Sequence, residues 1–225
     1  MKLLKINNQE YTVDSFGDAA LTLRPISTSV KTASVAQHIL SKKIKGVKEV
    51  IGTDHDITLI LNKKPKKILA ALAMLSWESV SPKIWEIPVC FEGFKDWERV
   101  EKETAISKAD YISKLTAEKI EVGMFGFIPG FVYFTGLNKR MQVSRKPVPQ
   151  TNTTNNVLAI GGPYIGIYSL PSPSGWNIIA KIPLKILEIE KERPIPFRIG
   201  DQIKLIPVSS EAFEKLAAKN QSIND

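Results

Sequence analysis

The chain has 225 residues, 43% of them hydrophobic and 24% charged, which is the composition of a globular protein. No run of about 18 apolar residues and no apolar signal-peptide core is present, and a single cysteine, Cys90, excludes an internal disulfide framework, so we expect a cytoplasmic protein without a membrane partner. The net charge of +8 permits acidic partners, but no nucleic-acid-binding motif, Cys/His zinc cluster or Walker phosphate loop accompanies it, so neither a nucleic-acid partner nor a bound metal is expected.

The first part of the chain alternates short strands with two helices. Strands are predicted over residues 11–15, 20–24, 47–51 and 57–61 and from about Lys83, and helices over residues 28–44 and 65–76. Ser27 and Thr28 are N-cap candidates for the first helix, and Gly46 ends it. From Ala20 onward the order is βαββαβ, the split βαβ pattern of ferredoxin-like folds. We therefore predict an α+β, ferredoxin-like N-terminal domain over residues 1–84.

The composition changes near Trp85, where we place a domain boundary. A charged segment over residues 92–104 is followed by a helix over Lys108–Ala117, with Ser107 as its N-cap. Short strands separated by Gly and Pro are then predicted over residues 157–160, 164–168, 177–182, 186–189 and 202–207, before a terminal helix over residues 210–219. This spacing is typical of a closed or sandwiched β body, which we assign to residues 85–225.

Residues 122–134 form the densest apolar and aromatic run in the sequence. At its centre, Pro129 fixes φ near −65° and Gly130 accepts a positive φ, as a type II turn over residues 128–131 requires. Apolar arms on both sides predict a hairpin. Glycines inside strands often mark the close approach of a ligand or of another backbone, and three glycines lie within eight residues here. Two interpretations therefore stay open, a buried core hairpin and the wall of a binding site.

Four other side chains are candidates for function, and each also has a structural explanation. Arg145 could bind a carboxylate or phosphate, or form a surface ion pair. Trp176 could line a pocket or fill the end of the β body. Cys90 is better explained as a buried thiol than as a nucleophile, and His55 as part of a polar hairpin tip than as a metal ligand or catalytic group.

Several short phrases together carry a resemblance to a known family. They are Gly17-Asp18-Ala19-Ala20-Leu21, Ile87-Pro88-Val89-Cys90-Phe91, Gly126-Phe127-Ile128-Pro129-Gly130-Phe131-Val132-Tyr133-Phe134, Arg145, Pro173-Ser174-Gly175-Trp176 and Gly200-Asp201. In order and spacing they resemble the family of the B subunits of bacterial 5-oxoprolinase, also labelled allophanate hydrolase subunit 1, over residues 15–208. That family includes the inhibitor of a sporulation histidine kinase.

The resemblance implies a small α+β N-terminal domain followed by a cyclophilin-like β-barrel. It implies a larger partner subunit of related barrel architecture and a third subunit, which together open the lactam of 5-oxoproline to glutamate at the expense of ATP. The ATP site in this chain and the catalytic residues stay unknown. The substrate-binding residues that it suggests are Phe127, Pro129, Gly130, Phe131, Arg145, Gly175 and Trp176.

The sequence also departs from the family pattern at several positions. Leu115 stands about where a histidine is usual, Gln150 replaces an arginine after Pro149, and residues 153–156 replace a Pro-Ala-Gly-Ser-like phrase. Ser174 replaces a glycine, and Ala180-Lys181 replaces a Gly-Arg pair. Losing an imidazole and a guanidinium removes an acid–base group and an anion clamp. A hydrolase subunit and a non-catalytic module, such as a histidine kinase inhibitor, therefore both stay open.

Overall fold

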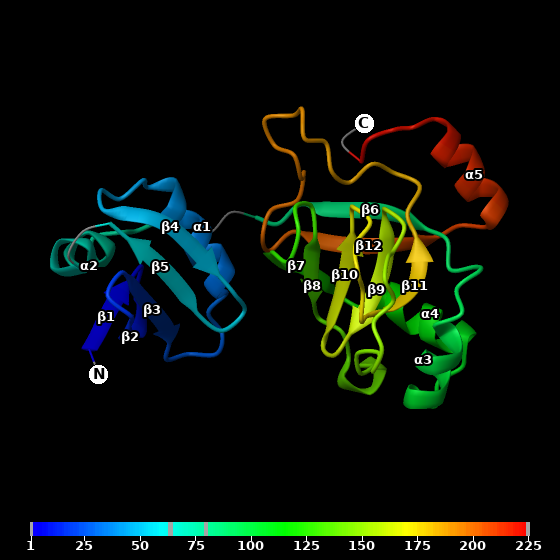
Figure 1. Ribbon diagram of the computed structural model, residues 1–225, viewed down its shortest axis with the longest axis horizontal. Helices are drawn as coiled ribbons and strands as arrows, with labels where there is room; N and C mark the ends of the chain where they lie inside the picture. Colours follow the sequence, from blue (N-terminus) through cyan, green and yellow to red (C-terminus); the bar gives the residue numbers. More distant parts are fainter. Residues whose placement is uncertain (1, 63–64, 79–80, 224–225) are drawn as a thin grey trace. The chain divides into compact units, whose positions relative to one another are not determined.

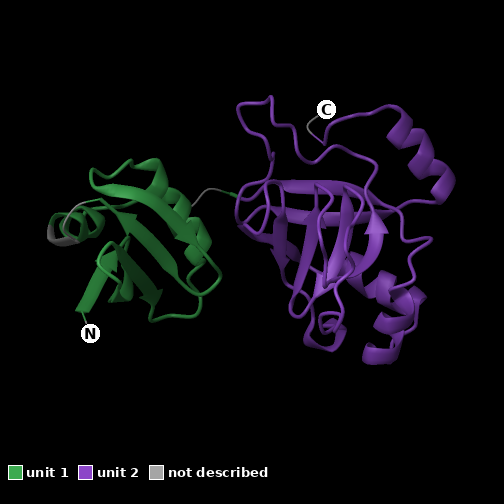
Figure 2. Ribbon diagram, in the orientation of Figure 1, with its two compact units in different colours: residues 1–81 green, residues 82–225 purple. Residues whose placement is uncertain are grey.

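The computed structural model describes residues 2–62, 65–78 and 81–223, and the chain divides into two compact units, residues 1–81 and 82–225 (Figures 1 and 2). The elements of unit 1 are β1 (Lys2–Ile6), β2 (Gln9–Phe16), β3 (Ala20–Pro25), α1 (Thr32–Ser41), β4 (Val47–Gly52), β5 (Ile57–Leu61) and α2 (Pro65–Ala73). Its sheet has the order β1-β2-β3-β5-β4, and every neighbouring pair is antiparallel. One hydrophobic core joins both helices to this sheet.

The last strand of the predicted βαββαβ pattern does not belong to this sheet. The predicted strand near Lys83 is β6 (Ile84–Val89), which lies in unit 2 and pairs there with β12 (Gln202–Pro207). In unit 1 the edge of β3 that β6 would have joined is paired with β2. The two strands are connected by a turn at Gly17, where φ is +63°. That part of the prediction was wrong because a local hairpin occupies the place beside β3.

The first helix also begins later than predicted. α1 starts at Thr32, and Lys31 at its N-cap position makes no side-chain capping bond. The Oγ atoms of Ser27 and Ser29 lie 2.8 Å apart, and Ser27 Oγ accepts a bond from the backbone N–H of Ser29. Ser27 therefore closes a local turn ahead of the helix. Serine side chains commonly bond to nearby backbone groups in such turns instead of capping a helix.

Tyr11 in the core of unit 1 predicts a pH dependence of stability. Its side chain is fully buried, its hydroxyl has no hydrogen-bond partner among the described residues, and burial raises its pKa to about 12. Unfolded tyrosine ionises near pH 10, so the folded state is penalised between pH 10 and 12, and the free energy of unfolding should fall by about 1.4 kcal/mol per pH unit there. Tyr11→Phe should remove this component in urea unfolding followed at pH 8 and 10.5.

Tyr111 of unit 2 provides the contrasting variant. It is equally buried, but its hydroxyl donates to the carbonyl oxygen of Met141. At neutral pH, Tyr111→Phe should therefore cost about 1 kcal/mol, whereas Tyr11→Phe should cost nothing or stabilise, since it removes an unpaired polar group. Equal losses in the two variants at pH 8 would contradict this account of Tyr11.

Unit 2 is built on a seven-stranded curled sheet. Its elements are β6, α3 (Trp97–Thr104), α4 (Lys108–Ala117), β7 (Ile120–Phe125), β8 (Val132–Thr135), a 3-10 helix (Lys139–Met141), β9 (Val157–Gly161), β10 (Tyr164–Tyr168), β11 (Asn177–Lys181), β12 and α5 (Ser210–Ala218). The strand order is β11-β9-β10-β8-β7-β12-β6. An isolated bridge between Cys90 and Lys181 brings the chain after β6 against β11, so the two ends of the sheet meet there (Figure 1). The predicted mixed α+β class is confirmed.

Local predictions in unit 2 had mixed outcomes. Ser107 caps α4 by accepting from the backbone N–H of Asp110, and Cys90 is a buried free thiol, both as predicted. The charged segment before α4 contains α3, which was not predicted. The strand predicted over residues 186–189 was wrong. Ile186 is buried there outside the strands of the sheet, and the N–H of Glu188 bonds the carbonyl oxygen of Pro194 within the same irregular loop.

Asp201 fixes the start of the β6–β12 pair. Its carboxylate accepts from the N–H of Lys83 at 3.0 Å, from Nε1 of Trp85 at 2.9 Å and from the N–H of Arg198 at 2.9 Å. Gly200 precedes it with a φ of +92°, a backbone region that favours glycine. The Gly200-Asp201 phrase therefore has a structural role in this fold. Of the helices in the described part of the chain, none has the length and apolarity needed to cross a bilayer.

Candidate functional site

The glycine-rich hairpin forms the turn that the sequence predicts. β7 and β8 are antiparallel, and the N–H of Phe131 donates to the carbonyl oxygen of Ile128 at 3.1 Å across the turn. Gly130 has a φ of +83°, the conformation that the third position of a type II turn requires. Phe127, just before the turn, also has a positive φ of +67°, which is uncommon for a bulky residue, and its ring is 60% exposed.

The two turn residues Pro129 and Gly130 support the site from outside it. A Cβ at Gly130 would lie 2.9 Å from Leu187 and 3.0 Å from Ser169, and the Ser169 hydroxyl donates to the Gly130 carbonyl oxygen at 2.6 Å. The turn is therefore held between the end of β10 and the loop that contains Leu187. Its other side carries Phe131 into an aromatic cluster.

Phe131 is the centre of that aromatic cluster and is 1% exposed. Its ring contacts the rings of Phe127 at 5.5 Å, Tyr133 at 4.5 Å, Tyr168 at 4.7 Å and Trp176 at 5.5 Å, measured between centroids and all in edge-on geometry. Edge-on pairs are a favourable arrangement of aromatic quadrupoles. The cluster therefore presents a rigid apolar surface.

Two glycines in neighbouring strands make room for the cluster. A Cβ at Gly161 in β9 would lie 2.4 Å from the Trp176 ring, and a Cβ at Gly166 in β10 would lie 2.5 Å from Phe131 and 2.9 Å from Trp176. Neither position tolerates a side chain while the rings keep their places. The two strands therefore form a flat floor on which Phe131 and Trp176 lie.

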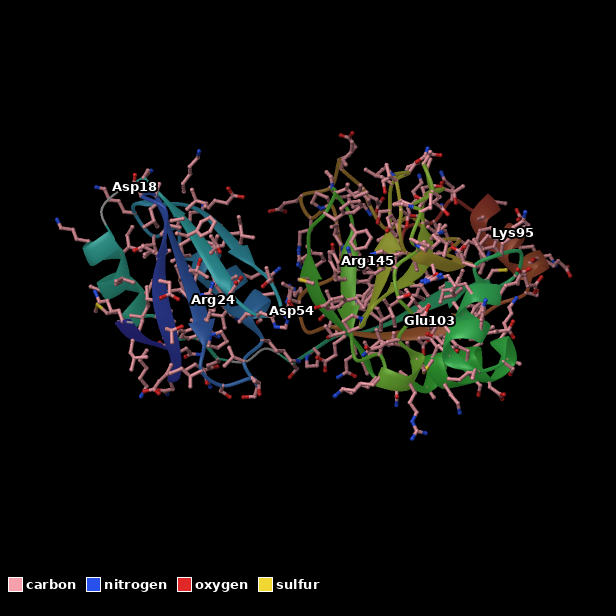
Figure 3. The ribbon with its side chains drawn as sticks, turned by 60° about the horizontal axis from the view of Figure 1, so that its bottom comes forward. Asp18, Arg24, Asp54, Lys95, Glu103 and Arg145 are labelled. Carbon is pink, nitrogen blue, oxygen red and sulfur yellow. The ribbon has the colours of Figure 1, made fainter. Side chains whose placement is uncertain are left out.

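Above this floor is a cavity of about 530 Å³. It is lined by three segments of unit 2 that are distant in sequence: the β7–β8 hairpin, the chain around Arg145 (Figure 3) and the chain that leads into β11. The lining residues are Phe127, Ile128, Phe131, Tyr133, Arg145, Lys146, Pro149, Tyr168, Ser172, Pro173, Ser174, Gly175 and Trp176. This volume is in the range of small-molecule binding sites.

The two cations in the lining differ in their partners. Lys146 Nζ lies 2.8 Å from Oδ2 of Asp96 and 2.8 Å from Oε1 of Gln150, and its side chain is only 13% exposed. Arg145 forms no ion pair among the described residues, and its guanidinium carbon lies 5.8 Å from the Trp176 ring centroid. Lys146 is therefore neutralised within the fold, whereas the charge of Arg145 is available to a ligand.

Four hydroxyl-bearing side chains, Tyr133, Tyr168, Ser172 and Ser174, complete the polar side of the cavity. Ser174 Oγ donates to the Tyr168 hydroxyl at 2.9 Å and accepts from the N–H of Trp176 at 3.1 Å. Burial raises the pKa values of Tyr133 and Tyr168, and the nearby positive charge of Arg145 opposes this rise in both. Both phenols are therefore neutral hydrogen-bond donors at physiological pH.

Five of the seven residues suggested by the resemblance lie together in the cavity wall. They are Phe127, Phe131, Arg145, Gly175 and Trp176, while Pro129 and Gly130 lie outside the lining. Sequence reasoning did not select Tyr133, Lys146, Tyr168 and Ser174, which also line the cavity. Tyr133 and Ser174 lie within the short sequence phrases that carry the family resemblance, so those phrases could have indicated them as site residues. Tyr168 and Lys146 join the wall through pairings distant in sequence, which no local pattern reveals.

Several departures from the family pattern lie away from this cavity. Leu115 is fully buried in the main core of unit 2, and Ala180 is buried in the same core. Lys181 pairs with Glu214, with 3.4 Å between Nζ and Oε1. Gln150 does contribute indirectly, because its side-chain oxygen holds Lys146. The substitutions at Leu115 and Ala180 therefore remove no group from the cavity lining.

Residues 11–197 match the family described as carboxyltransferase domain, subdomain C and D, and the chain belongs to this family. Its relatives include proteins named as B subunits of 5-oxoprolinase, which confirms the resemblance seen in the sequence. The Bacillus subtilis (strain 168) protein is 33% identical over 136 residues, which cover 60% of this chain and little more than half, 57%, of that protein. The Escherichia coli O157:H7 protein is 29% identical over 170 residues, which cover 72% and 78% of the two chains.

Solved structures support the same fold. An uncharacterized protein from Pyrococcus horikoshii has a TM-score of 0.56 and 25% identity, covering 90% of this chain and 100% of that one. The urea amidolyase of K. lactis has a TM-score of 0.72 at 17% identity, covering 98% of this chain but 16% of that one. Among the sequence relatives, a urea amidolyase from Lachancea kluyveri is 28% identical over 166 residues, which cover 61% of this chain and 9% of that protein.

Proposed function

We propose that this chain is one subunit of an ATP-dependent 5-oxoprolinase, a complex that opens the lactam of 5-oxoproline to glutamate. The observation that carries the proposal is family membership together with three relatives named as 5-oxoprolinase subunits, at 29–33% identity. The cavity of unit 2 is the proposed substrate site in this chain, with Phe127, Phe131, Arg145, Gly175 and Trp176 as binding residues and Pro129 and Gly130 as their support. The names of the relatives, 5-oxoprolinase and urea amidolyase, are those of amide-cleaving enzymes, which favours this function over a kinase inhibitor.

The proposal includes partners. The relatives are named as one lettered subunit of 5-oxoprolinase, which implies others, and in the two urea amidolyases the matched segment is a small part of a longer chain. We therefore propose that a larger subunit of related barrel architecture and a third subunit complete the enzyme in the cytoplasm. We further propose that unit 1 is a variant of the ferredoxin-like fold and unit 2 a cyclophilin-like barrel, on the basis of the β3-α1-β4-β5-α2 order and of the curled sheet.

The cavity does not fit ATP. A triphosphate carries several negative charges, whereas Arg145 is the one cation in the lining without an ion-pair partner among the described residues. The sequence also lacks a Walker loop. We therefore assign ATP use to the complex and no ATP-binding residue to this cavity.

Reconstitution tests the proposal. The chain is co-expressed with the larger and third subunits, and glutamate release from 5-oxo-L-proline is measured with and without ATP. We expect release that requires ATP and all three chains. A stable complex without turnover would refute the enzyme function for this chain. Turnover that continues after the chain is omitted would refute its role as a necessary subunit.

A further inference from the structure

We propose that one face of helix α3 is the positioning element for the cavity residue Arg145. This face, called the α3 face below, consists of Asp96, Arg99 and Glu103, and its side chains hold residues 144–146. The cavity lining, as far as the structure describes the chain, contains none of the three side chains of the α3 face. The inference therefore adds residues that the proposed function does not use, and it rests on that function only for the binding role of Arg145.

The segment that carries Arg145 has no regular secondary structure to hold it. Residues 144–146 lie outside the helices and strands of unit 2. Loops that lack the hydrogen bonds of a helix or a sheet are the more mobile parts of a fold. An arginine side chain has a large rotamer entropy, so ordering it on a mobile backbone lowers the affinity for a ligand. A site that uses Arg145 therefore requires other groups to fix this segment.

Glu103 and Arg99 hold the chain at Ser144 and Arg145 (Glu103 and Arg145 are labelled in Figure 3). Oε1 of Glu103 accepts from the backbone N–H of Ser144 at 2.6 Å, and Oε2 accepts from the Ser144 hydroxyl at 3.0 Å. Nη2 of Arg99 donates to Ser144 Oγ at 2.6 Å and to the carbonyl oxygen of Arg145 at 3.4 Å. The two helix side chains also pair, with 3.2 Å between Nη2 and Oε2. Ionised groups make the stronger hydrogen bonds, and here their charges cancel, so the charge of Arg145 stays available.

Asp96 holds the next residue of the segment. Its Oδ2 accepts from Lys146 Nζ at 2.8 Å and from the backbone N–H of Ile178 in β11 at 2.7 Å. The side chains of Asp96 and Lys146 are only 22% and 13% exposed, so solvent screens this ion pair less than a surface pair. The backbone N–H of Lys146 also donates to the carbonyl oxygen of Gly175 at 2.6 Å. The segment is therefore fixed on both sides of Arg145.

The helix that carries these side chains is itself anchored in the core of unit 2. The residues of the α3 face are spaced i, i+3 and i+7, which places them on one side of the helix. On the neighbouring side, Trp97 and Val100 are 3% and 0% exposed. The indole N–H of Trp97 donates to the carbonyl oxygen of Ile179 in β11 at 3.0 Å. The α3 face therefore connects the segment of Arg145 to the hydrophobic core.

Nitrogen-15 relaxation of the full chain tests the inference without a ligand. In Glu103→Ala we expect the order parameter of the Arg145 amide to fall from about 0.85 to below about 0.6, with a parallel loss of order at its side-chain Nε. Glu103→Gln keeps an acceptor for the N–H of Ser144 but loses the charge that pairs with Arg99, so its effect should lie between. Glu98→Ala is the matched control, because it removes an exposed carboxylate of the same helix outside the α3 face.

A double-mutant cycle in the reconstituted complex tests the consequence for function. Glu103→Ala should raise KM for 5-oxo-L-proline about fivefold and change kcat by less than about twofold, because the cost of ordering one arginine falls on binding. In the Arg145→Gln background the same substitution should leave KM unchanged. A merely structural role of Glu103 would instead lower the urea midpoint and reduce activity by the same factor in both backgrounds.

The outcomes separate this inference from the proposed function. An Arg145 amide that stays ordered in the Glu103 variants, or an equal effect on KM in both backgrounds, would overturn the inference. If Glu103→Ala does not fold, Glu103→Gln supplies the same two comparisons. A complex without turnover would refute the proposed function, and the relaxation measurement would still decide the inference. Turnover together with an unchanged Arg145 amide would leave the proposed function standing.

Discussion

Gly166→Ala should lower the free energy of unfolding of unit 2 by about 2–3 kcal/mol, because it adds a methyl group to a fully packed site. The new Cβ would lie 2.5 Å from Phe131 and 2.9 Å from Trp176. Phe131 is held by four other rings, so it cannot move aside without breaking the cluster. The same displacement should disturb the cavity floor, and ligand affinity should fall with stability.

Gly126→Ala is the matched control for this variant. Gly126 lies in the β7–β8 hairpin that carries Phe131, but its added Cβ would meet only Tyr133, at 3.9 Å, an ordinary contact distance. We expect its effect to be within about 0.5 kcal/mol or slightly stabilising, since alanine restricts the unfolded chain. Urea unfolding followed by Trp fluorescence measures both variants. A Gly166→Ala protein as stable as Gly126→Ala would show that the rings are not tightly packed over β10.

Asp201→Ala should be the second large loss, of about 3 kcal/mol. The substitution leaves the N–H groups of Lys83 and Arg198 and the indole N–H of Trp85 without their acceptor. Unpaired donors in a buried place cost about 1–3 kcal/mol each, and water can reach part of this site. The effect should appear as a lower urea midpoint for unit 2.

Glu86→Ala is the control for Asp201→Ala, because it removes an exposed carboxylate from the same β6–β12 pair. Glu86 in β6 and Lys204 in β12 form an exposed ion pair, with 2.8 Å between charged atoms. Exposed ion pairs contribute little, so this variant should lose less than about 1 kcal/mol. If both variants lose the same amount, the burial of Asp201 is not what makes it important.

The sequence predicted the hairpin turn and failed for the cavity floor, and the difference has a physical cause. The turn at Pro129-Gly130 is determined by the φ preferences of its own residues, so the four consecutive residues 128–131 are enough to predict it. Gly161 and Gly166 are required by rings from other strands, Phe131 and Trp176, and no local pattern records such a contact. The resemblance suggested Trp176 and Arg145 as site residues, but it did not reveal how their side chains are arranged relative to each other.

The wrong strand predictions have a related cause. Residues 186–189 have the apolar composition of a strand, but Ile186 is buried and Leu187 half-buried without forming a ladder. The strand near Lys83 was correctly located and wrongly paired, because its partner β12 lies 118 residues later. Apolar patterning reveals which residues are buried, whereas the partner of a strand depends on the whole fold.

The parallel pairing of β6 with β12 affects the order in which the chain can fold during synthesis. β6 is the first strand of unit 2 and β12 the last, with Ile84 opposite Gln202. Unit 1 is complete in sequence once residue 81 has left the ribosome, whereas unit 2 must wait for residues 202–207. Closing so long a loop is slow and leaves apolar strands exposed meanwhile. We therefore expect the nascent chain to expose the apolar strands of unit 2 until β12 has been synthesised.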